Sequence, residues 1–195
     1  MAILKVARMG HPVLREVARE FTVAEILSAE TQALVKDLVE TMDEYGGIGI
    51  AAPQVHVSRS IALIDYQEES DEDASEEIEA APLPLTVVIN PKITILDDTK
   101  QGYWEGCLSV PEIRGLVYRP RKIQIDYLDI EAKPQKIVAE GFLATVFQHE
   151  LDHLFGVLFV DRVVYAPGKS PIAFTAEYSK YLTPDEDDEI GELDD

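Results

Sequence analysis

The residue pattern with the clearest chemical meaning is His149-Glu150-Leu151-Asp152-His153, in which two histidines lie four positions apart and a glutamate follows the first. On an α-helix, residues i and i+4 lie on one face, so both imidazoles can reach one metal ion while the glutamate flanks it. Metallohydrolases use this arrangement, with the glutamate as a general base. The alternative is an exposed helix face that carries two histidines by accident.

The sequence around this motif predicts a helix that packs on a core. Gly141 precedes the motif and Gly156 follows it, at the places where helix boundaries are expected. We therefore expect the two histidines on a rigid, partly buried helix. Apolar residues recur there at spacings of three and four, namely Phe142, Leu143, Val146, Phe147, Leu151 and Leu154.

A catalytic metal site usually has three protein ligands and leaves one position for water. The chain offers no histidine and no acid between His153 and Asp161, so the third ligand must come from elsewhere. Cys107 is the best candidate, because the only thiol of the chain lies in a short turn after a predicted strand. A lone cysteine is otherwise most often a small buried hydrophobe. His11 and His56 are the other candidates.

Residues 46–54 form a segment rich in glycine and alanine. Such residues let the backbone approach a ligand closely, and the amide of Gln54 can donate a hydrogen bond. Taken alone, a segment of this kind is most often only a turn. It also lacks the lysine and the serine or threonine of a phosphate-binding loop.

The length of 195 residues suits one domain, and we expect residues 1–182 to form a single catalytic domain. The formal net charge of -20 is unevenly distributed, because residues 67–79 and 184–195 each carry eight acids and no base. Such segments cannot bury enough apolar surface to offset the entropy lost on ordering. We predict a mobile acidic insertion at about 66–84 and a disordered acidic tail at 183–195. An acidic tail that binds a partner is the alternative.

Composition also limits where the protein works and what it binds. The chain has no run of eighteen apolar residues and no secretory signal at its start, which favours a cytoplasmic protein that does not enter a membrane. A single cysteine agrees with a reducing compartment. The acidic balance argues against direct binding of nucleic acid.

Periodicity predicts an α+β fold in which mainly antiparallel sheets surround a central metal-binding helix, with a long N-terminal helix over residues 22–45. A short helix is expected within residues 171–182. The expected strands, rich in branched residues, are 60–65, 85–90, 92–96, 102–105, 115–118, 122–128 and 136–140.

Three segments in this order resemble the three signature motifs of the peptide deformylase family: residues 47–54 (GIGIAAPQ), 105–109 (EGCLS) and 148–153 (QHELDH). The resemblance extends to residues 10–15 (GHPVLR) and 158–162 (LFVDR). It covers about residues 3–165, interrupted by the acidic insertion.

The resemblance implies hydrolytic removal of the formyl group from formyl-methionine at the N-terminus of nascent polypeptides, with release of formate. A metal-bound hydroxide would attack the formyl carbon while Glu150 acts as acid and base. Gln54 and the backbone N–H of Leu108 would stabilise the charge on the formyl oxygen. By the same resemblance, the metal ligands are Cys107, His149 and His153.

The resemblance also implies a cofactor and a substrate pocket. One thiolate and two imidazoles accept several divalent ions, and the family favours Fe(II) over Zn(II), Ni(II) or Co(II). The pocket would hold the methionine side chain and an extended peptide. Its matching residues are Ile48, Gly49, Glu105, Gly106, Phe142, Thr145 and Val146. An ordinary core or loop role is the alternative for Phe142, Thr145 and Val146.

The partners implied are formyl-methionyl nascent peptides, with a transient ribosome contact as a further possibility. The tail after Tyr181 is acidic here, where a basic helix would favour docking on the ribosome. Two rival functions remain at this point. One is a metallopeptidase that cleaves internal peptide bonds, and the other is a non-catalytic binder with a structural metal site.

Overall fold

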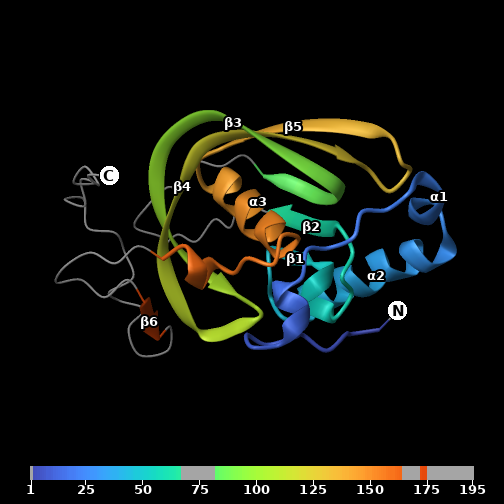
Figure 1. Ribbon diagram of the computed structural model, residues 1–195, viewed down its shortest axis with the longest axis horizontal. Coiled ribbons are helices and arrows are strands. Elements are labelled where there is room, and N and C mark those ends of the chain that lie inside the picture. The colour runs from blue at the N-terminus through green and yellow to red at the C-terminus, as the bar shows by residue number, and fades with distance from the viewer. Residues whose placement is uncertain (1, 67–81, 164–171, 175–195) are drawn as a thin grey trace.

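The computed structural model describes residues 2–66, 82–163 and 172–174, in which one sheet of six strands curves around a helix (Figure 1). Every pair of strands in this sheet is antiparallel, as predicted. The sheet has the order β1-β2-β3-β4-β5, and β6 pairs with β4. The strands are β1 (Gly49–Ala51), β2 (Ile61–Tyr66), β3 (Leu83–Cys107), β4 (Val110–Leu128), β5 (Pro134–Glu140) and β6 (Ile172–Phe174).

The prediction of one long N-terminal helix was wrong. After a short 3-10 helix, η1 (Pro12–Arg15), the chain forms α1 (Val23–Ile26) and then α2 (Ala29–Glu44). Thr22 and Ser28 are extended, and each accepts a backbone N–H of the helix that follows. Because an N-cap residue lies outside its own helix, Ser28 ends the first helix and starts the second. The helical periodicity of residues 22–45 did not reveal this break.

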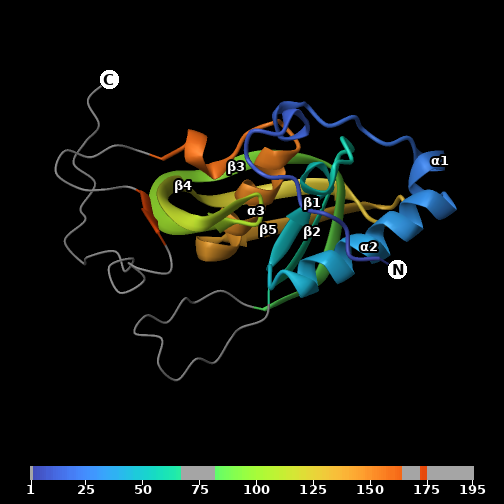
Figure 2. The same ribbon diagram turned by 90° about the horizontal axis from the view of Figure 1, so that it is seen from below.

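Two long strands replace most of the separate strands predicted between residues 85 and 128. β3 runs from Leu83 to Cys107 and β4 returns from Val110 to Leu128, joined by the turn at Leu108 and Ser109. Their register shifts at four places. Bulges of this kind bend a strand without ending its ladder. The hairpin therefore curves around the central helix and brings its turn close to the N-terminal segment (Figures 1 and 2).

The helix predicted to carry the histidines is α3 (Gly141–His153), and it lies inside the curved sheet (Figure 1). Phe147 on this helix packs in one hydrophobic cluster with Ile64 of β2. The neighbouring residue Leu63 points to the other face and packs with Met42 of α2. Alternate residues of β2 thus serve two cores, which is why residues 61–64 are all apolar.

Other predictions need correction at the level of single segments. The glycine-rich segment contains β1 and a second 3-10 helix, η2 (Ala52–Val55), and is more than a loop. The strands that flank the acidic insertion reach further towards it than predicted, since β2 extends to Tyr66 and β3 begins at Leu83. Ile172–Phe174 forms a strand where a helix was expected.

The remainder of the acidic insertion, residues 175–182 and the predicted tail lie outside the described residues. Within the part of the chain that the structure describes, no helix has both the length and the apolar character needed to cross a membrane.

Candidate active site

Three side chains with metal-binding atoms meet at the turn of the long hairpin. Cys107 is the last residue of β3, while His149 and His153 come from successive turns of α3. Their ligand atoms all lie within 4.8 Å of one another. The structure thus brings together the three residues that the resemblance implied as ligands. The other candidates, His11 and His56, meet edge to face with ring centroids 4.5 Å apart and do not join this group.

The donor set fits a divalent metal ion. The Sγ atom of Cys107 lies 3.3 Å from Nε2 of His153, and two ligands on one tetrahedral ion are separated by ~3.5 Å. The Nδ1 atom of His149 lies 2.7 Å from Oε2 of Glu105, which leaves its Nε2 for a ligand role. A thiolate with two imidazoles suits Zn(II), Fe(II), Co(II) or Ni(II).

The surroundings shift the pKa values of the two histidines in opposite directions. Burial lowers the pKa of His149, but its hydrogen bonds with Cys107 and Glu105 outweigh burial and hold the pKa well above its usual value. Burial lowers the pKa of His153 well below its usual value, and the positive charge of His149 adds to this effect. A neutral imidazole is the form that binds a metal, so the lowered pKa of His153 favours its role as a metal ligand.

Glu150 is the acid of the motif, and its carboxylate is buried beside β1. One of its oxygens, Oε2, has no hydrogen-bond partner among the described residues. Burial raises the pKa of Glu150 to about 7. A Cβ atom built on Gly49 would lie only 2.6 Å from Oε1 of Glu150, so only glycine leaves room for the carboxylate here. A buried carboxyl group with an unsatisfied oxygen is suited to exchange a proton with a water or a substrate.

Gln54 and Leu108 place two hydrogen-bond donors next to the cysteine. The Oε1 atom of Gln54 accepts the Ala51 N–H at 2.7 Å, which turns its amide nitrogen towards Cys107, 3.5 Å from Sγ. Leu108 is the first residue of the hairpin turn, and no acceptor among the described residues pairs with its N–H. Two N–H donors in one cleft can stabilise negative charge that develops on an oxygen.

A cleft of about 470 Å³ opens over these groups. One wall comes from the β1 region, one from the hairpin turn and one from α3. All the residues predicted to bind substrate line the cleft, namely Ile48, Gly49, Glu105, Gly106, Phe142, Thr145 and Val146. Tyr45, Trp104 and Arg114 also line it and were not predicted. Its mixed lining of apolar side chains and backbone suits an extended peptide with an apolar first side chain.

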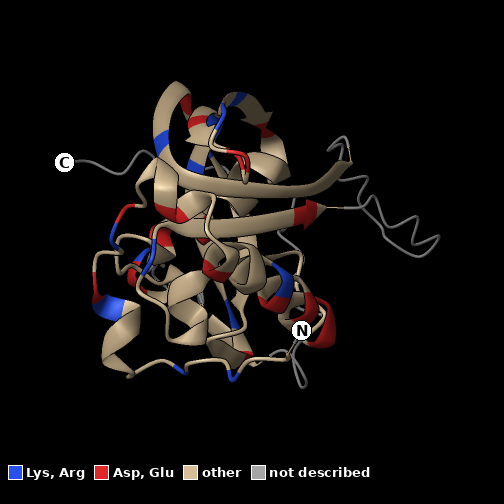
Figure 3. Ribbon diagram, turned by 90° about the vertical axis from the view of Figure 1, so that its right-hand side faces the viewer, with Lys and Arg blue, Asp and Glu red and all other residues tan. Residues whose placement is uncertain are grey.

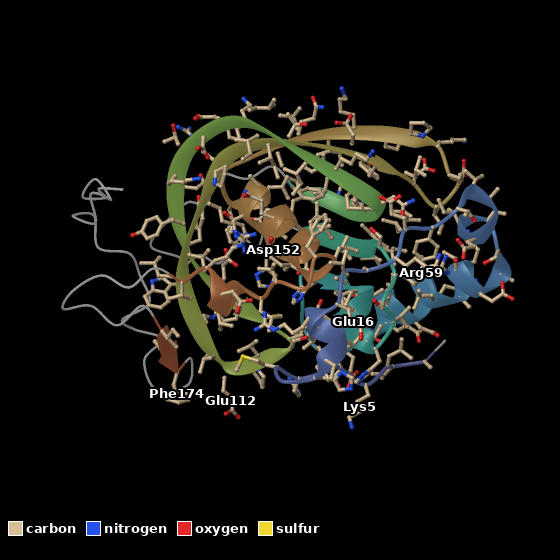
Figure 4. The ribbon with its side chains drawn as sticks, in the orientation of Figure 1. Lys5, Glu16, Arg59, Glu112, Asp152 and Phe174 are labelled. Atoms are coloured by element: carbon tan, nitrogen blue, oxygen red, sulfur yellow. The ribbon has the colours of Figure 1, made fainter. Side chains whose placement is uncertain are left out.

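Sequence reasoning missed the network that supports His149. Both oxygens of Glu105 accept hydrogen bonds from Arg119, whose other nitrogen donates to Asp152 at 2.8 Å. Asp152, at the centre of the molecule in Figure 4, also accepts two hydrogen bonds from Arg162. The side chain of Arg119 is only 3% exposed, and its buried charge is compensated by ion pairs with Glu105 and Asp152.

This network links β3, β4 and α3 around the three candidate ligands. Asp152 and Arg162 lie inside segments that carry the resemblance. Their residue types alone do not reveal which side chains they pair with. Arg119 had no sequence signal, because its role depends on the register of β3 and β4. Glu105 was predicted to hold the peptide through its backbone, and the sequence did not reveal that its carboxylate faces Arg119 and His149.

The family model for polypeptide deformylase matches residues 3–167. The peptide deformylase of Leptospira biflexa is 40% identical over 164 residues, covering 84% of this chain and 89% of that protein. The peptide deformylase of Halothermothrix orenii is 41% identical over 164 residues, covering 84% and 96%.

Solved structures give the same result. A class I type b peptide deformylase from Acinetobacter baumannii with bound Met-Ala-Ser is 33% identical, with a TM-score of 0.76, and covers 83% of this chain and 99% of that one. A peptide deformylase from Synechococcus elongatus in complex with actinonin is 37% identical, with a TM-score of 0.72, and covers 85% and 81%.

Proposed function

Because the chain belongs to the peptide deformylase family, we propose that Cys107, His149 and His153 hold the metal ion with which it removes the formyl group from the N-terminus of nascent polypeptides. The observation that carries this assignment is the convergence of the three ligand atoms within 4.8 Å, beside the buried Glu150. When bound, a divalent ion supplies Lewis acidity and lowers the pKa of a water molecule in the site.

Glu150 is the proposed acid and base. Its Oε2 atom has no partner among the described residues, and its carboxylate lies against Gly49 at the wall of the cleft. It takes a proton from the attacking water and passes a proton to the leaving amine. The leaving amine is the amino group of methionine, and the other product is formate.

Gln54 and Leu108 are the proposed oxyanion donors. The amide nitrogen of Gln54 is oriented by the Ala51 N–H, and the backbone N–H of Leu108 is free among the described residues. Together they stabilise negative charge that develops on the formyl oxygen. Removing one such donor typically lowers the rate by ~10²- to 10³-fold.

The methionine side chain is proposed to enter the apolar part of the cleft. Ile48, Phe142 and Val146 supply apolar surface there, and Thr145 completes the same wall. The backbone of Gly49 and of Glu105-Gly106 is proposed to hold the following residues of the peptide in an extended form, as a strand is held at a sheet edge.

The decisive experiment measures formate release from formyl-Met-Ala-Ser by the metal-loaded protein. We expect turnover of the formylated peptide and no turnover of the acetylated peptide. We also expect no cleavage of internal peptide bonds. Cys107→Ala is expected to lose both bound metal and activity. Full metal occupancy and full activity in Cys107→Ala would overturn the ligand assignment, and no formate from the wild-type protein would overturn the function.

We propose Fe(II) as the native metal on the basis of the family resemblance, since the thiolate and imidazole donor set accepts Fe(II) among several divalent ions. Metal analysis of protein purified without oxygen tests this proposal. We expect iron in about one equivalent, and activity that decays in air but persists after exchange with Ni(II). Zinc at full occupancy in the anaerobic protein would contradict it.

We place the reaction in the cytoplasm, where nascent chains emerge, and we propose that contact with the ribosome is transient. The net charge of -20 opposes a tight complex with ribosomal RNA. Along the ribbon of Figure 3, the segments coloured for Lys or Arg are interspersed with segments coloured for Asp or Glu. Co-sedimentation with ribosomes is expected to be weak at low salt and absent at higher salt. A stable complex at high salt would contradict this expectation.

A further inference from the structure

The N-terminal segment before η1 is hydrogen-bonded to both loops that carry the oxyanion donors. The N–H of Ala7 donates to the carbonyl oxygen of Gln54 at 2.7 Å, and the N–H of Met9 donates to the carbonyl oxygen of Ser109 at 2.7 Å. Between them, the Nη1 atom of Arg8 donates to the carbonyl oxygen of Leu108 at 2.5 Å. Three consecutive residues therefore join the η2 segment to the hairpin turn.

Core packing accounts for part of this segment but not for Arg8. The side chain of Ala7 is buried in the cluster that contains Val110 of β4. That contact requires the backbone of the segment to lie where it does. Arg8 is exposed and contributes nothing to the cluster, yet its guanidinium turns back onto the backbone of the turn. An exposed arginine can keep its charged head in water, so core packing does not explain why the guanidinium lies on the turn.

The hydrogen bond from Arg8 holds the carbonyl group of Leu108, the residue whose N–H is the proposed oxyanion donor. The turn has two residues, Leu108 and Ser109, and both of their carbonyl oxygens are held by the N-terminal segment. A hydrogen bond from a charged donor is stronger than one between neutral groups. With both carbonyl oxygens held, the backbone of the turn has little freedom to rotate. The N–H of Leu108 lies in the peptide unit just before the held carbonyl group, and it is thereby restrained at the cleft that Gln54 also lines.

We propose that Arg8 is a positioning residue for the oxyanion hole, which it orders by holding the carbonyl group of Leu108. This inference rests on the function proposed above for Gln54 and Leu108. Arg8 does not touch the substrate; it acts through the turn. A donor must lie close to the place where negative charge develops. A small displacement of the turn therefore reduces stabilisation of the transition state more than it reduces binding of the substrate.

The test compares four variants of the metal-loaded full chain with formyl-Met-Ala-Ser as the substrate. Arg8→Met removes the donor and keeps the apolar stem, Arg8→Lys keeps a charged donor, and Arg8→Gln keeps a shorter neutral one. Lys5→Met is the matched control, because Lys5 is an exposed base of the same segment and has no partner among the described residues (Figure 4). Each protein is also measured for metal content and thermal unfolding.

We expect Arg8→Met to lower kcat about tenfold with KM within about twofold, a smaller loss than the ~10²-fold effect of a full 1 Å misplacement. Arg8→Lys is expected to recover most of kcat, Arg8→Gln to fall between, and Lys5→Met to match the wild type. Metal content is expected to stay constant across the series. A role in stability alone would lower the unfolding temperature and leave kcat of the folded enzyme unchanged.

Several results would overturn the inference. These are wild-type kcat in Arg8→Met, an equal loss in Arg8→Lys and Arg8→Met, a loss confined to KM, and a loss explained by missing metal. If Arg8→Met does not fold, wild-type kcat in Arg8→Gln overturns it equally. Absence of formate release from the wild-type enzyme would be a failure of the proposed function instead, so the two failures are distinguishable.

Discussion

The Oε2 atom of Glu105 lies 2.7 Å from Nδ1 of His149, and Glu105 precedes Cys107 by only two residues on the same strand. One short piece of β3 therefore carries a candidate metal ligand and the group that orients another ligand. The carboxylate is held in turn by Arg119 through two hydrogen bonds. The positions of the thiolate and of the first imidazole are thus mechanically linked through the sheet.

Replacing Glu105 by glutamine is expected to weaken metal binding. The variant loses the carboxylate that orients His149, and support of this kind is typically worth ~10- to 100-fold in metal affinity. It also leaves Arg119 with less compensating charge in a buried place, so the free energy of unfolding should fall by about 3 kcal/mol. Competition with a coloured chelator measures the first effect and urea unfolding measures the second.

The control for this experiment is Glu140→Gln. Glu140 pairs with Lys122 at the surface of the sheet, where both side chains are at least 40% exposed. Its loss should leave metal affinity unchanged and alter stability little. Equal metal affinity in Glu105→Gln and the wild type would show that the hydrogen bond to His149 has no such role.

Gly49→Ala is expected to lower kcat while the protein remains folded and loaded with metal. The added methyl group would lie 2.6 to 2.7 Å from atoms of the Glu150 side chain, so the carboxylate must move. Misplacing a catalytic group by about 1 Å can reduce the rate ~10²-fold. Steady-state kinetics with a formylated peptide and metal analysis check this prediction. A kcat within twofold of the wild type would show that Glu150 tolerates the displacement.

The pH dependence of stability should include a contribution from Glu25. The Thr22 backbone N–H is the main cause that lowers the pKa of Glu25 from 4.5 to about 2, and a bond from Arg19 adds to it. Because the folded state has the lower pKa, this stabilisation is fully present above pH 4.5 and is lost as pH falls towards 2.

The variant Glu25→Gln tests this sign. Its deficit in the free energy of unfolding relative to wild type should be largest above pH 5 and should shrink at pH 3. Glu16→Gln is the control, since Glu16 is exposed and its side chain has no partner among the described residues (Figure 4). A deficit that grows as pH falls would contradict the assignment.

Gly156→Ala should destabilise the fold more than Gly10→Ala. Both glycines have positive φ, at 73° and 101°, where a side chain costs about 1–2 kcal/mol. A Cβ atom on Gly156 would also lie 2.7 Å from the backbone of Arg15, whereas one on Gly10 would meet nothing within 4 Å. We expect a loss of at least about 3 kcal/mol for Gly156→Ala. Urea unfolding of the two variants separates the steric effect from the conformational one, and equal losses would refute the close contact.

The broad outline of the fold could be predicted because periodicity is local. The apolar run of β2 and the apolar face of α3 follow from residues that are neighbours in sequence. The break between α1 and α2 could not be predicted from periodicity, because it depends on the extended backbone of Ser28. The four register shifts between β3 and β4 were equally invisible, since a bulge depends on both strands.

The sequence by itself determined the types and local spacing of the chemical groups: two histidines one helical turn apart, the adjacent Glu150 and a single thiol. Helix geometry makes this possible, because i and i+4 share a face wherever the helix lies. Only the tertiary structure decided that Glu105 orients His149, that Arg119 joins two buried acids, and that Arg8 reaches the hairpin turn. Those contacts join segments far apart in the chain, and their partners depend on strand register and curvature, which local spacing does not encode.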